Sequence, residues 1–458
     1  MTRYRGLSWI GAALLCLAAP LATAAPGDWP VGFEKAPIGP VKTDRFSTSM
    51  VKFGRQSGIL YLPTTPGPNA RVGIVYASNV ALFEFSPAAE LASRGYRVLL
   101  VKHYLSDWRN ARQTSVDGFE DTNGGIAFMR GFPGVERVVL MGHDVGANMV
   151  AFYSAAAEEG GAICEDPELL LPCRKSQVSK LSKPDGVILL DPDLGALHAA
   201  SAVDPAMVGD SRSKRDVDMY AATNGYKAKV GVGKYSAAFE KRFFAAQAAR
   251  NEKIVDDAAA TLKLIQAGKA HFTDDEPLTV PGAANSGPRT RLYDTDLNLL
   301  SHTKVPHDLL KANGSNTKVV VTSVRSATPE KNVGRYASCC DTVRYTVRRF
   351  LGNDAVRTAP DFAITSDDIV GVNWRSSNTS TPGNAGHITV PTLVMVNSCS
   401  PFVVPGEIVF DHLAAKDKSY VAVEGAAHDF TPCNPQYGDT AKRTFDFLDS
   451  WLVQPGRF

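Results

Sequence analysis

The sequence predicts an α/β fold in which a mostly parallel central sheet is flanked by helices and interrupted by one large insertion. Short apolar runs alternate with helical stretches from residue 71 onward, which is typical of βαβ units. About 200 residues then separate the run that ends at Leu190 from the run that begins at Pro391. The chain has 458 residues, and single cores stop growing at about 250 to 300 residues. We therefore expect a core with an inserted cap.

Apolar runs and helical spacing place the individual elements. Core strands are expected at residues 71–77, 97–102, 136–141, 186–190, 391–396 and 419–423, with an antiparallel hairpin over 50–62 at the sheet edge. Helices are expected between them at residues 87–94, 118–129, 146–159, 405–415 and 440–452. Inside the insertion, Phe239, Phe243 and Leu262 recur near helical spacing and predict a long helix over 236–266. The core is thus expected over 25–193 and 386–458, and a large, mainly helical cap over 194–385, before the penultimate core strand.

Residues 1–24 have the pattern of an export signal peptide. Arg3 and Arg5 precede an apolar run from Leu7 to Leu21, and small residues follow it before Ala25. The run is shorter than the roughly 20 residues that span a bilayer, which disfavours the alternative of a membrane anchor. Cys16 lacks the small residue expected before a lipidated cysteine, so a lipoprotein is the minor alternative. We expect a secreted or periplasmic protein without a stable membrane anchor.

The cysteine pattern fits export. Without the signal the chain keeps Cys164, Cys173, Cys339, Cys340, Cys399 and Cys433, an even number in a compartment where disulfides persist. The first two flank a short loop, and the last two lie in segments that the fold brings together, so both pairs are candidate bridges. The pairing of the middle two stays open. A zinc site is the alternative, but the cysteines lack the required spacing with matching histidines.

Composition limits the partners. The formal net charge is +2, which provides no basic field for a nucleic acid. No metal and no organic cofactor is implied, and the expected partner is a small or medium organic substrate. The sequence does not indicate an oligomeric state.

The strongest chemical signal is the segment Gly142-His143-Asp144-Val145-Gly146. It lies between an apolar run and a helical stretch, which gives the order strand, sharp turn, helix. In a nucleophile elbow the central residue has a strained backbone, and glycines two positions to either side avoid clashes. The sequence therefore predicts an elbow with Asp144 at its centre.

From about Arg71 to its end, the chain resembles the α/β-hydrolase superfamily. The text GHDVGA is similar to the G-x-D-x-G form of epoxide hydrolases and haloalkane dehalogenases. The rest of the sequence, including the segments FFAAQAARNEKI and GAAHDF, is more similar to exported bacterial α/β-hydrolases that normally have a serine at the elbow. The resemblance implies the α/β-hydrolase fold with Asp144 in the place of the nucleophile.

The other members of a catalytic triad can be placed by the same resemblance. His428 follows the last expected strand, where this fold delivers its catalytic histidine. Relatives usually place an aspartate after the strand over 391–396, whereas this chain has Ser400. The acid is then expected from the end of the preceding core strand, at Asp191 or Asp193, although both also fit a turn cap. Asp193 is slightly preferred, because a residue past the strand end can reach the cleft.

An oxyanion hole would stabilise negative charge beside the elbow. It would use the backbone N–H of Val145 and a second donor from the loop after 71–77. Asn79 is the candidate for that second donor.

An aspartate nucleophile restricts the chemistry. A carboxylate attacks saturated carbon to give an alkyl-enzyme ester, which water activated by His428 then hydrolyses. Val145 replaces the tryptophan that dehalogenases of this fold commonly carry, which disfavours halides. Epoxide opening needs an acid, usually a cap tyrosine, and the candidates are Tyr220, Tyr226, Tyr235, Tyr293, Tyr336 and Tyr345. Three functions stay open: an epoxide-hydrolase-like enzyme, an ester or lactone hydrolase with a modified triad, and a degenerate ligand-binding protein.

Overall fold

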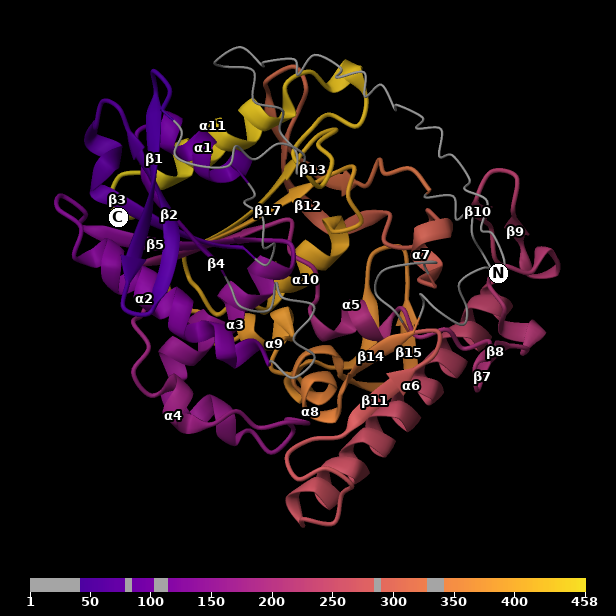
Figure 1. Cartoon of the computed structure of the whole chain (residues 1–458). Helices are drawn as coiled ribbons and strands as arrows, with labels where there is room; N and C mark the ends of the chain where they lie inside the picture. Colours follow the sequence, from indigo (N-terminus) through magenta and orange to yellow (C-terminus); the bar gives the residue numbers. More distant parts are fainter. Residues whose placement is uncertain (1–41, 79–84, 103–113, 284–289, 328–341) are drawn as a thin grey trace, which may run out of the picture.

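A ten-stranded sheet runs through the computed structural model, in the order β1-β2-β4-β3-β5-β6-β17-β18-β12-β13. The structure describes residues 42–78, 85–102, 114–283, 290–327 and 342–458. Figure 1 shows the sheet crossing the molecule from the indigo hairpin near the C-terminus to the segments coloured orange and yellow.

The centre of the sheet is parallel, as the sequence predicts. It consists of β3 (Val72–Ser78), β4 (Arg97–Lys102), β5 (Arg137–His143), β6 (Gly186–Leu190), β17 (Thr392–Asn397) and β18 (Lys418–Val423). The predicted antiparallel hairpin is formed by β1 (Phe46–Phe53) and β2 (Gln56–Pro63), and β2 pairs antiparallel with β4. Because both faces of the central strands are covered, they consist of nearly continuous apolar residues.

Helices cover both faces of the sheet, and each face has its own apolar core. Neighbouring residues of β3 point to opposite faces, so that Ile74 packs with α1 (Phe85–Ser93) and α11 (Thr440–Leu452). Val75 packs on the other side, with α2 (Phe119–Arg130), α3 (Val145–Glu159) and α10 (Val403–His412). These helices were predicted to within a few residues at each end.

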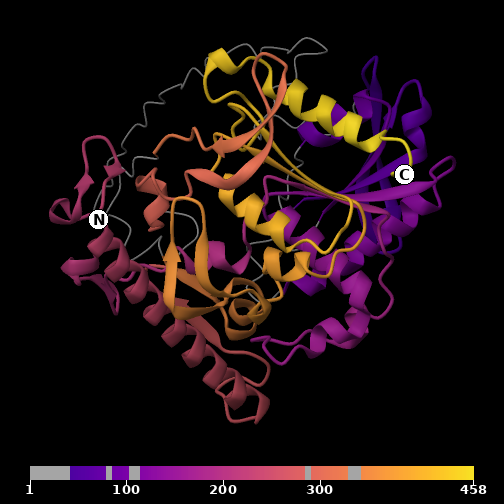
Figure 2. The ribbon, with the colours of Figure 1, turned by 180° about the vertical axis from the view of Figure 1, so that it is seen from behind.

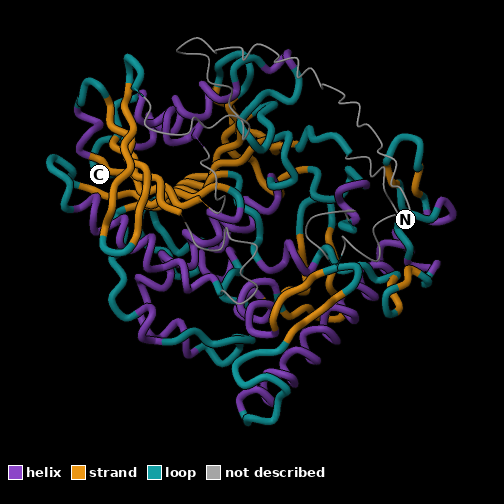
Figure 3. Tube along the Cα trace, viewed as in Figure 1, coloured by secondary structure: helices purple, strands orange, loops and turns teal. Residues whose placement is uncertain are grey.

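The insertion contains the predicted long helix, α6 (Ala237–Gln266), whose first turn is capped by Ser236 accepting from the N–H of Phe239. Figure 2 shows α6 on the side of the molecule opposite the β1–β2 hairpin, in agreement with Figure 1. The insertion also forms strand pairs that helical spacing did not indicate (Figure 3). These are β7 (Met207–Val208) with β8 (Ser211–Arg212), β9 (Tyr226–Lys227) with β10 (Val232–Gly233), β11 (Pro277–Val280) with β14 (Val343–Thr346), and β15 (Arg357–Ile364) with β16 (Ile369–Asn373). Short helices are α4 (Lys175–Val178), α5 (Ala196–Ala200), α7 (Leu292–Thr295), α8 (Val347–Arg349) and α9 (Thr381–Ala385).

One part of the insertion belongs to the main sheet. Strands β12 (His302–Leu310) and β13 (Asn316–Thr322) form a hairpin, and β12 pairs in parallel with β18. The expected cap over 194–385 therefore includes a segment of the core sheet. The sequence of β12, HTKVPHDLL, has polar residues and a proline. Pro306 lies where the pairing with β13 is irregular and before the residues that pair with β18, and strands accept proline at such bulges.

Two disulfides join the pairs of cysteines that the sequence analysis singled out. Cys164 is bonded to Cys173 and Cys399 to Cys433. Cys339 and Cys340 lie outside the described residues, as does the expected signal peptide over 1–24. Among the described residues, none of the helices combines the length and apolar character needed to cross a bilayer.

Glu407 of α10 holds the start of β12 against the core. Its buried carboxylate accepts hydrogen bonds from the N–H groups of Lys304 and Val305, and it lies 2.8 Å from Nε2 of His307. We expect Glu407→Ala to lower the free energy of unfolding by about 3 kcal/mol, because these buried groups lose their shared partner. Urea unfolding measures the change. Glu136→Ala, which removes an exposed carboxylate 3.9 Å from Arg71, should cost less than about 1 kcal/mol. Equal effects of the two substitutions would contradict this role.

Candidate active site

The turn between β5 and α3 has the geometry predicted for a nucleophile elbow. Asp144 has φ 54° and ψ −128°, a strained conformation for a residue with a side chain. A Cβ added to Gly142 would overlap the backbone carbonyl of Gly146 and lie 2.7 Å from the nitrogen of Ala147. The backbone therefore requires glycine at position 142, and it presents Asp144 at the carboxyl edge of the sheet.

His428 lies between two carboxylates. Its Nδ1 is 2.6 Å from Oδ2 of Asp191, and its Nε2 is 3.7 Å from Oδ1 of Asp144. The ring stacks on His143 at 4.5 Å between centroids and meets Phe402 edge to face at 5.5 Å. These contacts fix the orientation of the imidazole, with one nitrogen toward each carboxylate.

The acid that contacts His428 is Asp191, which corrects the preference for Asp193. Asp191 is fully buried and has φ 45°, so the chain turns at this residue and directs its side chain toward β17 and His428. Its Oδ1 accepts hydrogen bonds of 2.9 Å from the N–H of Asn397 and from the hydroxyl of Ser400. Ser400, at the position where relatives usually have the acid, thus supports an acid that comes from β6.

Asp144 and His428 shift each other's pKa, and Asp191 adds to the shift of the histidine. Burial raises the pKa of Asp144, but the hydrogen bond and the charge of His428 outweigh it and lower the pKa to about 2. Burial lowers the pKa of His428, but hydrogen bonds to Asp144 and Asp191 and their charges raise it well above the ordinary value. These two shifts have the same effect: they favour an imidazolium beside the Asp144 carboxylate.

Asp193 lines a cavity beside the elbow. The cavity has a volume of about 190 Å³, and its lining includes Val145, Asn148, Asp193, Tyr345, Arg349 and Asp354. Asn148 donates to Oδ1 of Asp193, and the N–H of Gly195 donates to the same atom at 2.7 Å. Burial, followed by the charge of Asp144, raises the pKa of Asp193 to about 7. Arg349 and Asp354 were not predicted as site residues, because they come from the insertion.

The other predicted site residues do not all lie beside the elbow. Val145 begins α3, where backbone N–H groups have no acceptor within the helix, while Asn79 and Tyr336 lie outside the described residues. Tyr293 lines a second, small cavity of about 20 Å³ with His198 and Phe402. The hydroxyl of Tyr235 donates to the carbonyl of Met219. Tyr220 and Tyr226 pack edge to face, and neither is in the lining of these two cavities.

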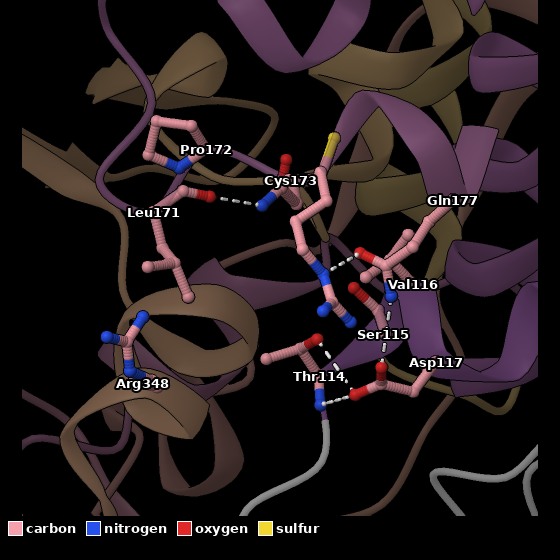
Figure 4. A pocket seen from close by; sticks show the side chains of 11 residues that line it. Thr114, Ser115, Val116, Asp117, Leu171, Pro172, Cys173, Gln177 and Arg348 are labelled. Atoms are coloured by element: carbon pink, nitrogen blue, oxygen red, sulfur yellow. Dashed lines mark hydrogen bonds between the residues drawn. The ribbon is translucent and has the colours of Figure 1, made fainter. Parts of the chain in front are cut away.

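A larger cavity, of about 290 Å³, lies apart from these residues (Figure 4). Figure 4 shows Thr114, Ser115 and Asp117 on one side and Leu171 and Pro172 of the disulfide loop on the other. The carboxylate of Asp117 accepts from the N–H of Thr114 and from the amide of Gln177. The lining contains neither the elbow nor the histidine and its acid.

Three side chains place potential metal ligands close together. One atom each of His143, Asp191 and His428 lies within 4.8 Å of the others. Nε2 of His143 is hydrogen-bonded to the carbonyl of His428 at 3.0 Å, and Nδ1 of His428 contacts Asp191. Because these atoms already pair with one another, the group fits a proton relay better than a metal centre.

No protein-family model and no curated protein matches the chain. It is similar to three solved structures at low identity. Brefeldin A esterase, described as a bacterial homologue of human hormone sensitive lipase, is 13% identical with a TM-score of 0.40, over 92% of this chain and 81% of that chain. Carboxyl esterase 2 from the mycorrhizal fungus Tuber melanosporum is 13% identical with a TM-score of 0.38, over 92% and 89%. A monoglyceride lipase variant from Saccharomyces cerevisiae is 11% identical with a TM-score of 0.38, over 91% and 98%.

The fold assignment rests on the chain's own geometry. The parallel centre of the sheet, the elbow directly after β5, and the histidine after β18 occur in the order that the α/β-hydrolase fold requires. The chain therefore has the α/β-hydrolase fold.

Gly142→Ala tests the elbow. We expect it to lower the free energy of unfolding by about 1 to 3 kcal/mol, because the new methyl group must displace the backbone of Gly146. Thermal or urea unfolding measures this loss. Gly131→Ala is the matched control, since a Cβ there has its nearest contacts at an ordinary 3.6 Å. If Gly142→Ala leaves the free energy of unfolding unchanged, the backbone of Gly146 does not lie as close to position 142 as the structure shows.

Asp191→Asn tests which aspartate acts on the histidine. We expect it to lower the pKa of His428, because one of the two carboxylates that raise this pKa is removed. An NMR titration of the imidazole measures the shift. Asp193→Asn makes the same substitution two residues away and should leave this pKa nearly unchanged, because Asp193 is not among the groups that raise it. The reverse result would favour Asp193.

Proposed function

We propose that the protein is a hydrolase in which Asp144 attacks a saturated carbon of a small or medium organic substrate, as epoxide hydrolases do. One observation carries this proposal. The elbow presents a carboxylate to a histidine, and that histidine is oriented by a buried acid. The group has every part of a nucleophile, base and acid relay, with aspartate in the place of serine.

The first step needs an ionised nucleophile. With a pKa of about 2, Asp144 is a carboxylate throughout the neutral range. One of its oxygens would bond to carbon while the carbon–oxygen bond of the substrate breaks, which leaves an alkyl-enzyme ester and an alkoxide. Attack on an ester carbonyl would instead give a mixed anhydride, a poor intermediate, so acyl transfer through Asp144 is disfavoured.

The second step needs a neutral histidine. Formation of the ester removes the charge of Asp144, which is one of the two charges that raise the pKa of His428. The pKa of the imidazole then falls, and it can release its proton to solvent. Neutral His428, held by Asp191, would take a proton from water as the water attacks the ester carbonyl. Collapse of the adduct returns the Asp144 carboxylate and frees the alcohol.

An ester or lactone hydrolase is the second candidate, favoured by the resemblance of the flanking sequence to serine enzymes. It would require Asp144 or His428 to activate water directly. In the resting protein the two carboxylates favour the protonated imidazole, which is a poor base for that role. A ligand-binding protein without activity is the third candidate, and it gives no reason for keeping the elbow, the histidine and its acid together.

We also propose that the protein is exported, to the periplasm or the medium. The two disulfides between described residues fit an oxidising compartment. The proposed signal over residues 1–24 agrees with this location.

His428→Gln should trap the covalent intermediate, because the ester forms but no base activates water. We expect intact mass spectrometry to show a mass increase equal to the whole epoxide, and peptide mapping to place it on Asp144. The panel should include halides, esters and lactones. Asp144→Asn in the same background is the control and should stay unmodified.

The outcomes separate the candidates. Turnover of an ester by the unaltered protein, with no adduct on the His428→Gln chain, would favour direct activation of water. Neither adduct nor turnover across the panel would favour the ligand-binding protein.

A further inference from the structure

We propose that Asp193 donates the proton that the departing oxygen takes up when Asp144 opens the substrate. This assignment rests on the function proposed above. It gives Asp193 a role distinct from that of Asp191, which contacts the histidine.

The position of Asp193 suits a donor into the cavity. Its side chain is almost fully buried, and it lines the 190 Å³ cavity together with Val145, the residue after the nucleophile. Among the described residues, Asn148 and Gly195 donate hydrogen bonds to its carboxyl group, and both bonds end on Oδ1. Asn148 is itself fixed, since its Oδ1 accepts from the hydroxyl of Thr381 at 2.6 Å. One oxygen is thus anchored, and Oδ2 is left to carry a proton toward the cavity.

The strength of the acid matches the task. Burial and the charge of Asp144 raise the pKa of Asp193 to about 7, against the bonds from Gly195 and Asn148 and the charge of Arg291. An acid whose pKa is near the working pH is the most effective proton donor. When Asp144 becomes an ester its charge disappears, and one cause of the raised pKa disappears with it. Asp193 therefore becomes a stronger acid as the alkoxide forms.

The other groups of the cavity are poorer donors at neutral pH. The negative charge of Asp354, followed by burial, raises the pKa of Tyr345 to about 12. Burial raises the pKa of Asp354 to about 6, so it is mostly ionised at pH 7. Arg349 is a guanidinium, which hardly gives up a proton in a protein. Tyr293 lies in the lining of the other, smaller cavity.

The step balances with groups that the protein holds. A carboxylate oxygen of Asp144 bonds to carbon, the carbon–oxygen bond of the ring breaks, and the released oxygen takes the proton of Asp193. The proton that His428 then gives up passes through solvent to Asp193 and restores the acid. Water adds to the ester carbonyl and gives one proton to His428. The ester bond then breaks, and the second proton of the water passes to the departing alkoxide, which returns Asp144 as a carboxylate. The net reaction is epoxide plus water to a diol.

The test compares two leaving groups on one carbon skeleton. An epoxide releases an alkoxide that needs a proton, whereas an alkyl sulfonate ester releases a stable anion that does not. In the His428→Gln background, the rate of adduct formation on Asp144 is followed by intact mass with and without Asp193→Asn. The asparagine can accept the same bonds from Asn148 and Gly195, but it has no acidic proton. We expect the epoxide rate to fall about 100-fold or more and the sulfonate rate to change far less.

The pH dependence gives a second readout. Since the donor must be protonated, the epoxide rate should fall as pH rises through about 7, the pKa of Asp193, while the sulfonate rate stays level. His428 no longer lowers the pKa of Asp144 in this background, and the sulfonate, which needs an ionised Asp144 but no donor, is the internal control for titration of the nucleophile. The charged and titratable groups around Asp193 are Asp144, Arg291, Tyr293, Tyr345, Arg349 and Asp354.

Asp354→Asn is the matched control, because it makes the same chemical substitution at another carboxyl group with a raised pKa in the lining of the same cavity. It should alter the rates with the two substrates alike. Equal losses with both substrates in Asp193→Asn would overturn the proposal and leave Asp193 a role in shaping the elbow. The proposal would also be overturned if Tyr345→Phe lowered the epoxide rate selectively and Asp193→Asn did not. If neither substrate labels Asp144 in the His428→Gln chain, the nucleophile itself is wrong and this assignment fails with it.

Discussion

The placement of one imidazole between two carboxylates is the constraint on which the rest of the site depends. His428 reaches Asp191 with one nitrogen and Asp144 with the other, from a loop that follows the last parallel strand. Both carboxylates raise its pKa, and it lowers that of Asp144 in return. Asp144 and His428 therefore influence each other's charge state, and a change at Asp144 alters the acidity of the histidine directly.

Holding Asp191 in this place requires several segments to cooperate. The chain turns at Asp191 with a positive φ, and Asn397 and Ser400 at the end of β17 satisfy its second oxygen. The disulfide from Cys399 to Cys433 links the segment that carries Ser400 to the one that carries His428. A buried carboxylate without these donors would be costly. With the acid at the end of β6, Ser400 in the segment after β17 supports it through a hydrogen bond.

Sequence patterns predicted the features that depend on local chemistry. Continuous apolar runs marked the central strands because those are buried on both faces, and the glycines of the elbow reflect a backbone clash that any side chain at position 142 would meet. Features that depend on tertiary contacts could be predicted less well from the sequence. Strand β12 has few apolar residues and exists as a strand because it pairs with β13 and β18. The choice between Asp191 and Asp193 depended on how the backbone turns after β6 and on hydrogen bonds from Asn397 and Ser400. The roles of Asn79 and of residues 1–24 remain predictions.

Replacing serine by aspartate at an elbow changes what the neighbouring groups must do. A serine needs a neutral histidine at the start, because its hydroxyl proton must be removed before it can attack. A carboxylate attacks without a base, so a histidine that rests as an imidazolium does not impede the first step and becomes a base only once the nucleophile has lost its charge. In a serine enzyme that histidine also returns a proton to the leaving group. Here the histidine already carries a proton, but its Nε2 lies beside the attacking carboxylate of Asp144. Because attack on saturated carbon expels the oxygen on the side away from the nucleophile, we infer that the departing oxygen uses a separate donor. A buried carboxyl group whose acidity increases when Asp144 is neutralised meets that requirement, and Asp193 lies where such a group is needed.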